Sequence, residues 1–148
     1  MSAPELDVRP KPSRVSAHPS ITSDQISRLV DVFYGEIRTH ERLGPIFETR
    51  IDGDWQRHLD KMKLFWASVL LRTGDYKGKP VPVHMQLTNV ESEDFKAWLE
   101  TFRPVAKSIF EPEAALIVIA AAERIAQSLW LSMFGLAATT PPKWMQQT

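Results

Sequence analysis

The sequence has no cysteine among its 148 residues. Disulfide bonds, thiolate metal sites and the thioether links that attach some cofactors to a protein are therefore excluded. The absence suits a reducing compartment, and the first twenty residues lack the apolar core of a signal peptide. We therefore expect a cytoplasmic protein.

A surplus of charge of either sign is also missing. Lysine and arginine together number 18, as do aspartate and glutamate, so the formal net charge is zero. Without a basic surplus there is no electrostatic reason to expect a nucleic acid or an anionic membrane surface as a partner. No uncharged apolar run reaches the roughly 18 residues that suggest a membrane span, so we expect no membrane association.

Six of the 11 prolines lie near the two ends of the chain, four before residue 20 and two at residues 141 and 142. We therefore predict flexible tails over residues 1–20 and 137–148, around a single domain over residues 21–136. Within this domain the apolar residues recur at helical spacing, and no long alternating strand pattern occurs. These patterns predict an all-α fold.

The first half of the domain contains two predicted helices. The first begins within residues 21–40, where Thr22 and Gln25 have the spacing of a capping box. The glycines and proline of residues 41–54 are expected to break the helical pattern. The second helix is predicted over residues 54–71, with Asp54 as its N-cap.

The second half contains two more predicted helices, after an irregular connector and a short turn or helix around His84. Residues 92–110 form the first of them, and Pro104 is expected to kink or split it. Residues 111–134 form the last, with Pro112 at its first position and Gly135 as its C-cap. Because its middle is apolar nearly all round, we expect this helix to run through the core.

His58 lies on the apolar stripe of its helix, with Met62 and Phe65. A buried imidazole needs partners for its ring nitrogens. The residue is therefore either a core histidine bonded within the protein or a pocket residue that faces a ligand.

Tyr34 and Trp98 lie on the inward stripes of two other helices. Each combines a large apolar body with one hydrogen-bond donor, and singly each suits an ordinary core. With His58, however, three helices would each direct a donor to the interior. A core does not need this arrangement, whereas a pocket for a small polar or charged ligand does.

His84 follows the stiff, apolar segment GKPVPV, in which Pro80 and Pro82 exclude regular structure. It is either a solvated loop residue or a side chain held in one place. A haem iron needs one firmly held neutral imidazole on one side of a flat apolar pocket. Donors such as Tyr34, His58 and Trp98 on the other side would stabilise negative charge on bound dioxygen.

The sequence resembles the truncated haemoglobins, and specifically their third group. The similarity spans about residues 22–135 and depends on the order and spacing of several segments. These are FYGEIR (33–38), LGPIF (43–47), DWQRHLDKMKLFW (54–66), GDYKGKPVPVH (74–84), FKAWLETF (95–102) and AAERIAQSL (121–129).

The resemblance implies a truncated globin fold, a 2-over-2 helical sandwich around non-covalent b-type haem. It assigns His84 to the proximal iron ligand, and Tyr34, His58 and Trp98 to the distal side. It assigns Lys61 to a haem propionate. The other residues that it places around the haem are Phe33, Phe47, Met62, Phe65, Trp66, Leu87 and Phe95. The proline-rich N-terminal tail and Pro104 depart from the family pattern.

Three functions remain open at this level. The first is a haem protein that reversibly binds dioxygen, and with it carbon monoxide and nitric oxide. The second is a haem oxidoreductase that detoxifies nitric oxide or peroxide with the help of a reductase. The third is a haem-free helical interaction module, in which the inward aromatic residues are only core.

Overall fold

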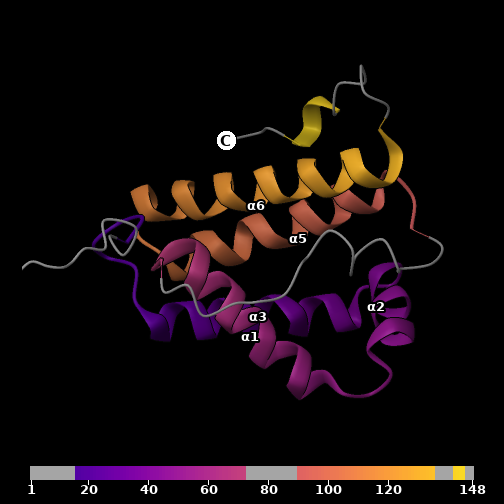
Figure 1. Cartoon of the computed structure of the whole chain (residues 1–148), viewed down its shortest axis with the longest axis horizontal. Coiled ribbons are helices and arrows are strands. Elements are labelled where there is room, and N and C mark those ends of the chain that lie inside the picture. The colour runs from indigo at the N-terminus through magenta and orange to yellow at the C-terminus, as the bar shows by residue number, and fades with distance from the viewer. Residues whose placement is uncertain (1–15, 73–89, 136–141, 146–148) are drawn as a thin grey trace, which may run out of the picture.

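The computed structural model describes residues 16–72, 90–135 and 142–145. Within these ranges the regular structure is entirely helical, as the sequence predicts (Figure 1). The elements are α1 (Ser23–Thr39), α2 (Leu43–Ile51), α3 (Trp55–Leu70), α5 (Asp94–Ile109), α6 (Pro112–Phe134) and the short 3₁₀ helix η3 (Lys143–Met145).

Helix α1 begins with the capping box that the sequence predicts. The backbone N–H of Gln25 donates to Thr22 Oγ1 at 3.2 Å, and the backbone N–H of Thr22 donates to Gln25 Oε1 at 2.9 Å. Two of the N–H groups that a helix start leaves without helical partners are thereby satisfied. The inward stripe of α1 is buried, and it consists of Ile26, Leu29, Val30, Phe33, Tyr34 and Ile37.

Helix α2 corrects the expectation that residues 41–54 are irregular. Pro45 is the third residue of this helix, where a missing N–H costs no helical hydrogen bond. Gly44 fits because α2 starts directly against the end of α1: a Cβ at Gly44 would lie 2.7 Å from the carbonyl oxygen of Arg38. The residues that suggested a break therefore permit a close helix–helix corner.

His40 joins α1 to α2. It is the C-cap residue of α1, as its position in the sequence suggests, but its ring serves the next helix. Its Nδ1 accepts hydrogen bonds from the backbone N–H groups of Arg42 and Leu43, each at 3.1 Å. The imidazole thus caps the N-terminus of α2.

Helix α3 starts where predicted, with Asp54 at the N-cap position, although the Asp54 side chain makes no capping hydrogen bond. Helix α5 is a single helix from Asp94 to Ile109, so Pro104 does not split it. Pro104 leaves the carbonyl of Glu100 without its helical donor. Both residues are exposed, so this carbonyl lies on the solvent side of the helix.

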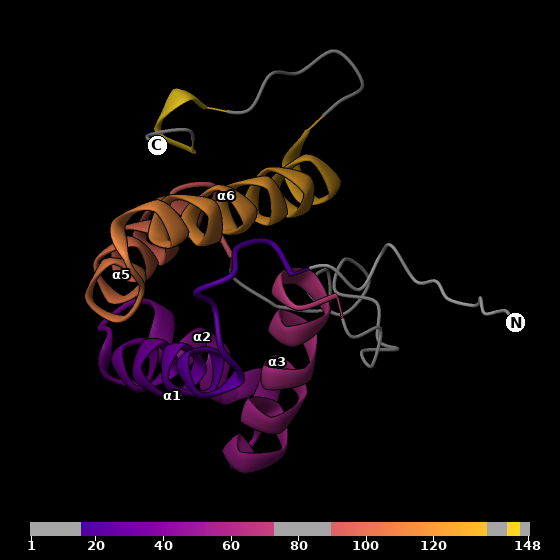
Figure 2. The same cartoon turned by 90° about the vertical axis from the view of Figure 1, so that its left-hand side faces the viewer.

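Helix α6 is the core helix that the sequence predicts. Pro112 is its first residue and Gly135 its C-cap, and ten of its residues are buried. Among the described residues, α6 is the one helix long and apolar enough to cross a membrane by length and composition. A core helix meets the same criteria, and α6 packs along α5 in the folded chain (Figures 1 and 2).

The helices are arranged around α5, which packs against both α6 and α1, while α3 crosses over α1 (Figure 2). Phe33, Leu29, Leu99 and Phe102 are among the most deeply buried side chains, and the rings of Phe33 and Phe102 meet where α1 packs against α5. This arrangement leaves α1, α3, α5 and α6 around a common interior space.

Parts of the two segments predicted as tails contact these helices. The backbone N–H of Ala17 donates to the carbonyl of Leu70 at 2.8 Å, and the His18 ring lies 3.2 Å from Glu113 Oε1. Near the other end of the chain, Met145 is fully buried. These contacts hold residues of both predicted tails against the helical domain.

Candidate functional site

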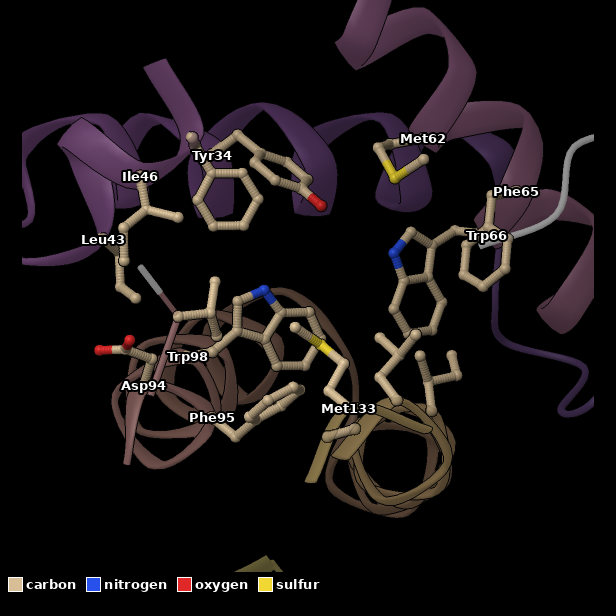
Figure 3. Close-up of a pocket in the computed structure, with 15 residues that line it drawn as sticks. Tyr34, Leu43, Ile46, Met62, Phe65, Trp66, Asp94, Phe95, Trp98 and Met133 are labelled. Carbon is tan, nitrogen blue, oxygen red and sulfur yellow. The ribbon is translucent and has the colours of Figure 1, made fainter. Parts of the chain in front are cut away.

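A cavity that is partly open to the surface lies in the space between the helices (Figure 3). Residues from α1, α2, α3, α5 and α6 line it, together with Val90: they are Tyr34, Leu43, Ile46, Phe47, Met62, Phe65, Trp66, Asp94, Phe95, Trp98, Ile125, Ala126, Leu129 and Met133.

The walls of the cavity are mostly apolar. Phe47, Met62, Phe65, Trp66 and Phe95, which the family resemblance places around a haem, are all in the lining. A large, flat, apolar group would gain from burial against such walls. The site therefore fits a macrocyclic cofactor such as haem better than it fits a small charged molecule.

Helix α6 contributes a wall that the sequence did not reveal. Ile125, Ala126, Leu129 and Met133 lie on one face of the helix and line the cavity. Their spacing is helical, but α6 is apolar on nearly every side. Periodicity in the sequence therefore could not distinguish the cavity face from the faces that pack against other helices.

Tyr34 directs its hydroxyl group into the cavity from α1 (Figure 3). The residue is 3% exposed, and its ring is held by edge contacts with neighbouring aromatic rings. The ring centroids of Phe33 and His58 lie 4.9 Å and 4.7 Å from that of Tyr34, and that of Phe47 lies at 6.1 Å. The hydroxyl is therefore presented by a closely packed ring.

Trp98 directs its indole nitrogen towards the same space from α5 (Figure 3). Its ring stacks on Phe102, with centroids 5.5 Å apart and an interplanar angle of 15°, and it meets the edge of Phe33 at 5.2 Å. Phe33 does not line the cavity but packs behind both Tyr34 and Trp98. It positions the two polar residues.

His58 does not line the cavity and lies beside Tyr34. Its ring is perpendicular to that of Tyr34, and it also lies 5.9 Å from the ring of Trp55 and 6.5 Å from that of Phe47. The structure thus brings His58 next to a residue of the cavity wall. Its direct contact with a ligand stays a prediction.

The structure does not place the remaining predicted site residues in the cavity wall. Lys61 is exposed on α3 and does not line the cavity, so its assignment to a propionate also stays a prediction. His84 and Leu87 lie outside the described residues. Among the described residues, no group of three histidine or acidic side chains could hold a metal ion by itself.

An ion pair at one end of the cavity was missed in the sequence. The carboxylate of Asp94 is 8% exposed, and it accepts hydrogen bonds from Arg42 Nε and from a terminal nitrogen of Arg42, both at 2.9 Å. It also accepts the backbone N–H of Glu91 at 2.7 Å. The hydrogen bond to Asp94 raises the pKa of Arg42.

The pair fixes the start of α5 to the corner between α1 and α2, and the Asp94 carboxylate points away from the middle of the cavity (Figure 3). The two residues are 52 positions apart in the sequence. The sequence shows that Asp94 lies in the first turn of a helix, but nothing in the sequence indicates that Arg42 is its partner.

Two comparisons identify relatives of the chain. The sequence is 34% identical over 110 residues to the group 3 truncated hemoglobin ctb of Campylobacter jejuni subsp. jejuni, and the match covers 72% of this chain and 87% of that protein. The crystal structure of the group III truncated hemoglobin from Campylobacter jejuni matches with a TM-score of 0.74 at 31% identity, over 79% of this chain and 94% of that one. No family model matches the sequence.

Proposed function

This chain belongs to the group III truncated haemoglobins, and from this premise we propose that it reversibly binds dioxygen and other diatomic gases. Membership of the globin family implies that it binds haem. We further propose that the haem is b-type and non-covalent, that it lies in the cavity described above, and that His84 is its iron ligand. The lack of cysteine supports non-covalent attachment.

The observation that carries this proposal is the polarity of the cavity. The Tyr34 hydroxyl and the Trp98 indole N–H point into a space whose walls are otherwise mostly apolar (Figure 3). Haem iron, when bound, supplies the atom to which a diatomic gas attaches. The two donors would then stabilise a ligand that draws negative charge onto its oxygen, because hydrogen bonds to charged acceptors are the stronger kind.

A haem oxidoreductase acting on nitric oxide or peroxide is the second candidate. The same observation favours it, because donors directed at a ligand's oxygen also polarise that ligand. Tyr34 and Trp98 would have the same positions in either function. The two candidates therefore differ in turnover with a reductase, and not in the residues of the site.

The experiment that tests the proposal is absorption spectroscopy of the full chain produced with haem available. We expect a strong Soret band that shifts when carbon monoxide is added to the ferrous protein, and a dioxygen complex that forms and dissociates reversibly. Multiple turnovers with nitric oxide or peroxide and a reductase would favour the oxidoreductase. A protein that folds but gives no Soret band would overturn both candidates and support a haem-free module.

A further inference from the structure

Trp66 differs from Trp55 and Trp130, the two other buried tryptophans, which lie outside the cavity. The indole N–H of Trp55 donates to Glu48 Oε1 at 2.8 Å, and that of Trp130 donates to Ser92 Oγ at 2.7 Å. Trp66 is 3% exposed, yet no residue in the described ranges accepts a hydrogen bond from its N–H. The N–H opens onto the cavity, and a donor that faces mostly apolar walls is unfavourable until an acceptor reaches it.

The direction of this N–H suggests where its acceptor belongs. Trp66 lines the cavity from α3, and its indole nitrogen faces the space into which the Tyr34 hydroxyl and the Trp98 nitrogen also point (Figure 3). The three polar groups come from three different helices. An acceptor atom in the middle of the cavity would face all three.

Packing fixes the Trp66 ring in this orientation. The ring stacks on Phe102, with centroids 5.4 Å apart and an interplanar angle of 26°, and it meets the edge of Phe65 at 5.5 Å. Phe102 has no exposed surface and also stacks on Trp98. One buried phenylalanine therefore supports both indoles, so their N–H directions are linked.

The simpler interpretation is that Trp66 only fills space in the wall. A phenylalanine would serve that purpose equally well, since it would keep the stack on Phe102 without burying a donor. Trp55 and Trp130, which are buried outside the cavity, show that this fold provides acceptors for buried indole N–H groups. The N–H groups of Trp66 and Trp98 are directed into the cavity instead (Figure 3).

We propose that Trp66 is a third hydrogen-bond donor of the ligand site, acting with Tyr34 and Trp98 on a small ligand with an oxygen acceptor. This inference rests on the proposed function, because dioxygen bound in the cavity is the acceptor that we have in mind. Trp66 binds the ligand itself and is therefore more than part of the haem wall.

The test uses the haem-loaded, full-length protein with ¹⁵N-labelled indoles, in its ferrous carbon monoxide and dioxygen complexes. Both complexes are diamagnetic, so ring-current effects of the haem are closely matched between them. The more polar dioxygen should shift the Trp66 and Trp98 Nε1–H resonances and leave those of Trp55 and Trp130 in place. Phenylalanine substitutions, each removing one resonance, assign the signals.

Dissociation kinetics provide the second readout. Trp66→Phe should speed dioxygen release about three- to tenfold, as expected for the loss of one hydrogen bond, and should change carbon monoxide release less. Trp130→Phe, which removes an N–H outside the cavity, should leave both rates unchanged. If Trp66→Phe fails to fold, the resonances of the unsubstituted protein still decide the question.

Two results would count against the proposal, and they are distinguishable. A Trp66 resonance with the same shift in both complexes, together with unchanged release from Trp66→Phe, would make Trp66 a wall residue and leave the proposed function intact. Absence of haem from the purified protein would instead remove the proposed function, and this inference with it.

Discussion

The two sides of α5 handle buried polar groups in opposite ways. On the side away from the cavity, the Arg103 guanidinium donates to Glu123 Oε2 at 3.1 Å and 2.9 Å, and to the carbonyl of Trp144 at 3.1 Å. Both members of this ion pair are at most 9% exposed. On the cavity side, Trp98 directs its N–H into open space (Figure 3).

The difference separates groups that stabilise the fold from groups that serve a ligand. When a buried polar group is bonded within the protein, removing its partner is costly because the remaining group stays buried without its hydrogen bonds. An indole N–H that faces the cavity, such as that of Trp98, is placed to gain a partner when a ligand binds. Substitutions on the outer side of α5 should therefore lower stability, whereas substitutions on the cavity side should alter ligand binding.

The largest effect is expected from His84→Ala, which removes the proposed iron ligand and leaves the cavity walls in place. Haem should bind weakly, and the protein should melt at a lower temperature. A ligand present at a thousandfold its Kd adds about 4 kcal/mol to stability. Thermal melts and absorption spectra measure both effects, and free imidazole should partly restore the spectrum. A normal five-coordinate ferrous spectrum without imidazole would show that another residue binds the iron.

The next largest effect is expected on the outer side of α5. Glu123→Ala leaves the Arg103 guanidinium buried without its carboxylate, which should cost about 3–5 kcal/mol of stability. Denaturant unfolding measures this loss, and dioxygen release should be unchanged in the protein that remains folded. The double variant Arg103→Met, Glu123→Leu is the control and should recover much of the loss. A changed rate of dioxygen release in this control would show that the outer side of α5 also affects the ligand site.

On the cavity side, Tyr34→Phe should speed dioxygen release about tenfold or more. A hydrogen bond to a charged group is worth about 1.5–3 kcal/mol, and each 1.4 kcal/mol is tenfold in an equilibrium constant. Combining it with Trp98→Phe should give less than the sum of the two effects, since both donors share one ligand. Stopped-flow release of carbon monoxide, which is less polar when bound, is the comparison. Equal acceleration of both gases would indicate steric control.

The smallest effect is expected from His58→Leu. Leucine keeps the bulk on this face of α3 but removes both ring nitrogens next to Tyr34. Ligand entry or release should change severalfold, and less than in Tyr34→Phe, because His58 contacts the Tyr34 ring and does not line the cavity. Flash photolysis and a thermal melt of this variant decide the matter. Loss of stability with unaltered rebinding would identify a core histidine outside the site.

Much of this arrangement could be predicted from the sequence. The apolar stripes locate α1, α3, α5 and α6, and the family and the globin fold are confirmed by the relatives. The inward positions of Tyr34 and Trp98 follow from helical periodicity. Their side chains lie in the cavity wall as that periodicity requires.

What the sequence could not reveal depends on contacts between distant segments. Helix α2 was missed because Gly44 and Pro45 usually interrupt helices, and the close approach to Arg38 that favours glycine is a tertiary contact. The partnership of Arg42 with Asp94 is likewise invisible in the sequence. The sequence does not show which indole N–H groups have an acceptor within the protein, so it could not distinguish Trp66 from Trp55 or Trp130.

The central claim is that donors facing the cavity belong to the ligand, and a matched pair of tryptophans tests it most directly. Trp98→Phe and Trp130→Phe make the same chemical change, but the N–H of Trp130 is bonded to Ser92 and that of Trp98 faces the cavity. Dioxygen release and thermal melting are measured for both variants. We predict that Trp98→Phe speeds release about tenfold with little change in melting, and that Trp130→Phe lowers the melting temperature with little change in release. The opposite pattern, or the same pattern in both variants, would contradict the account.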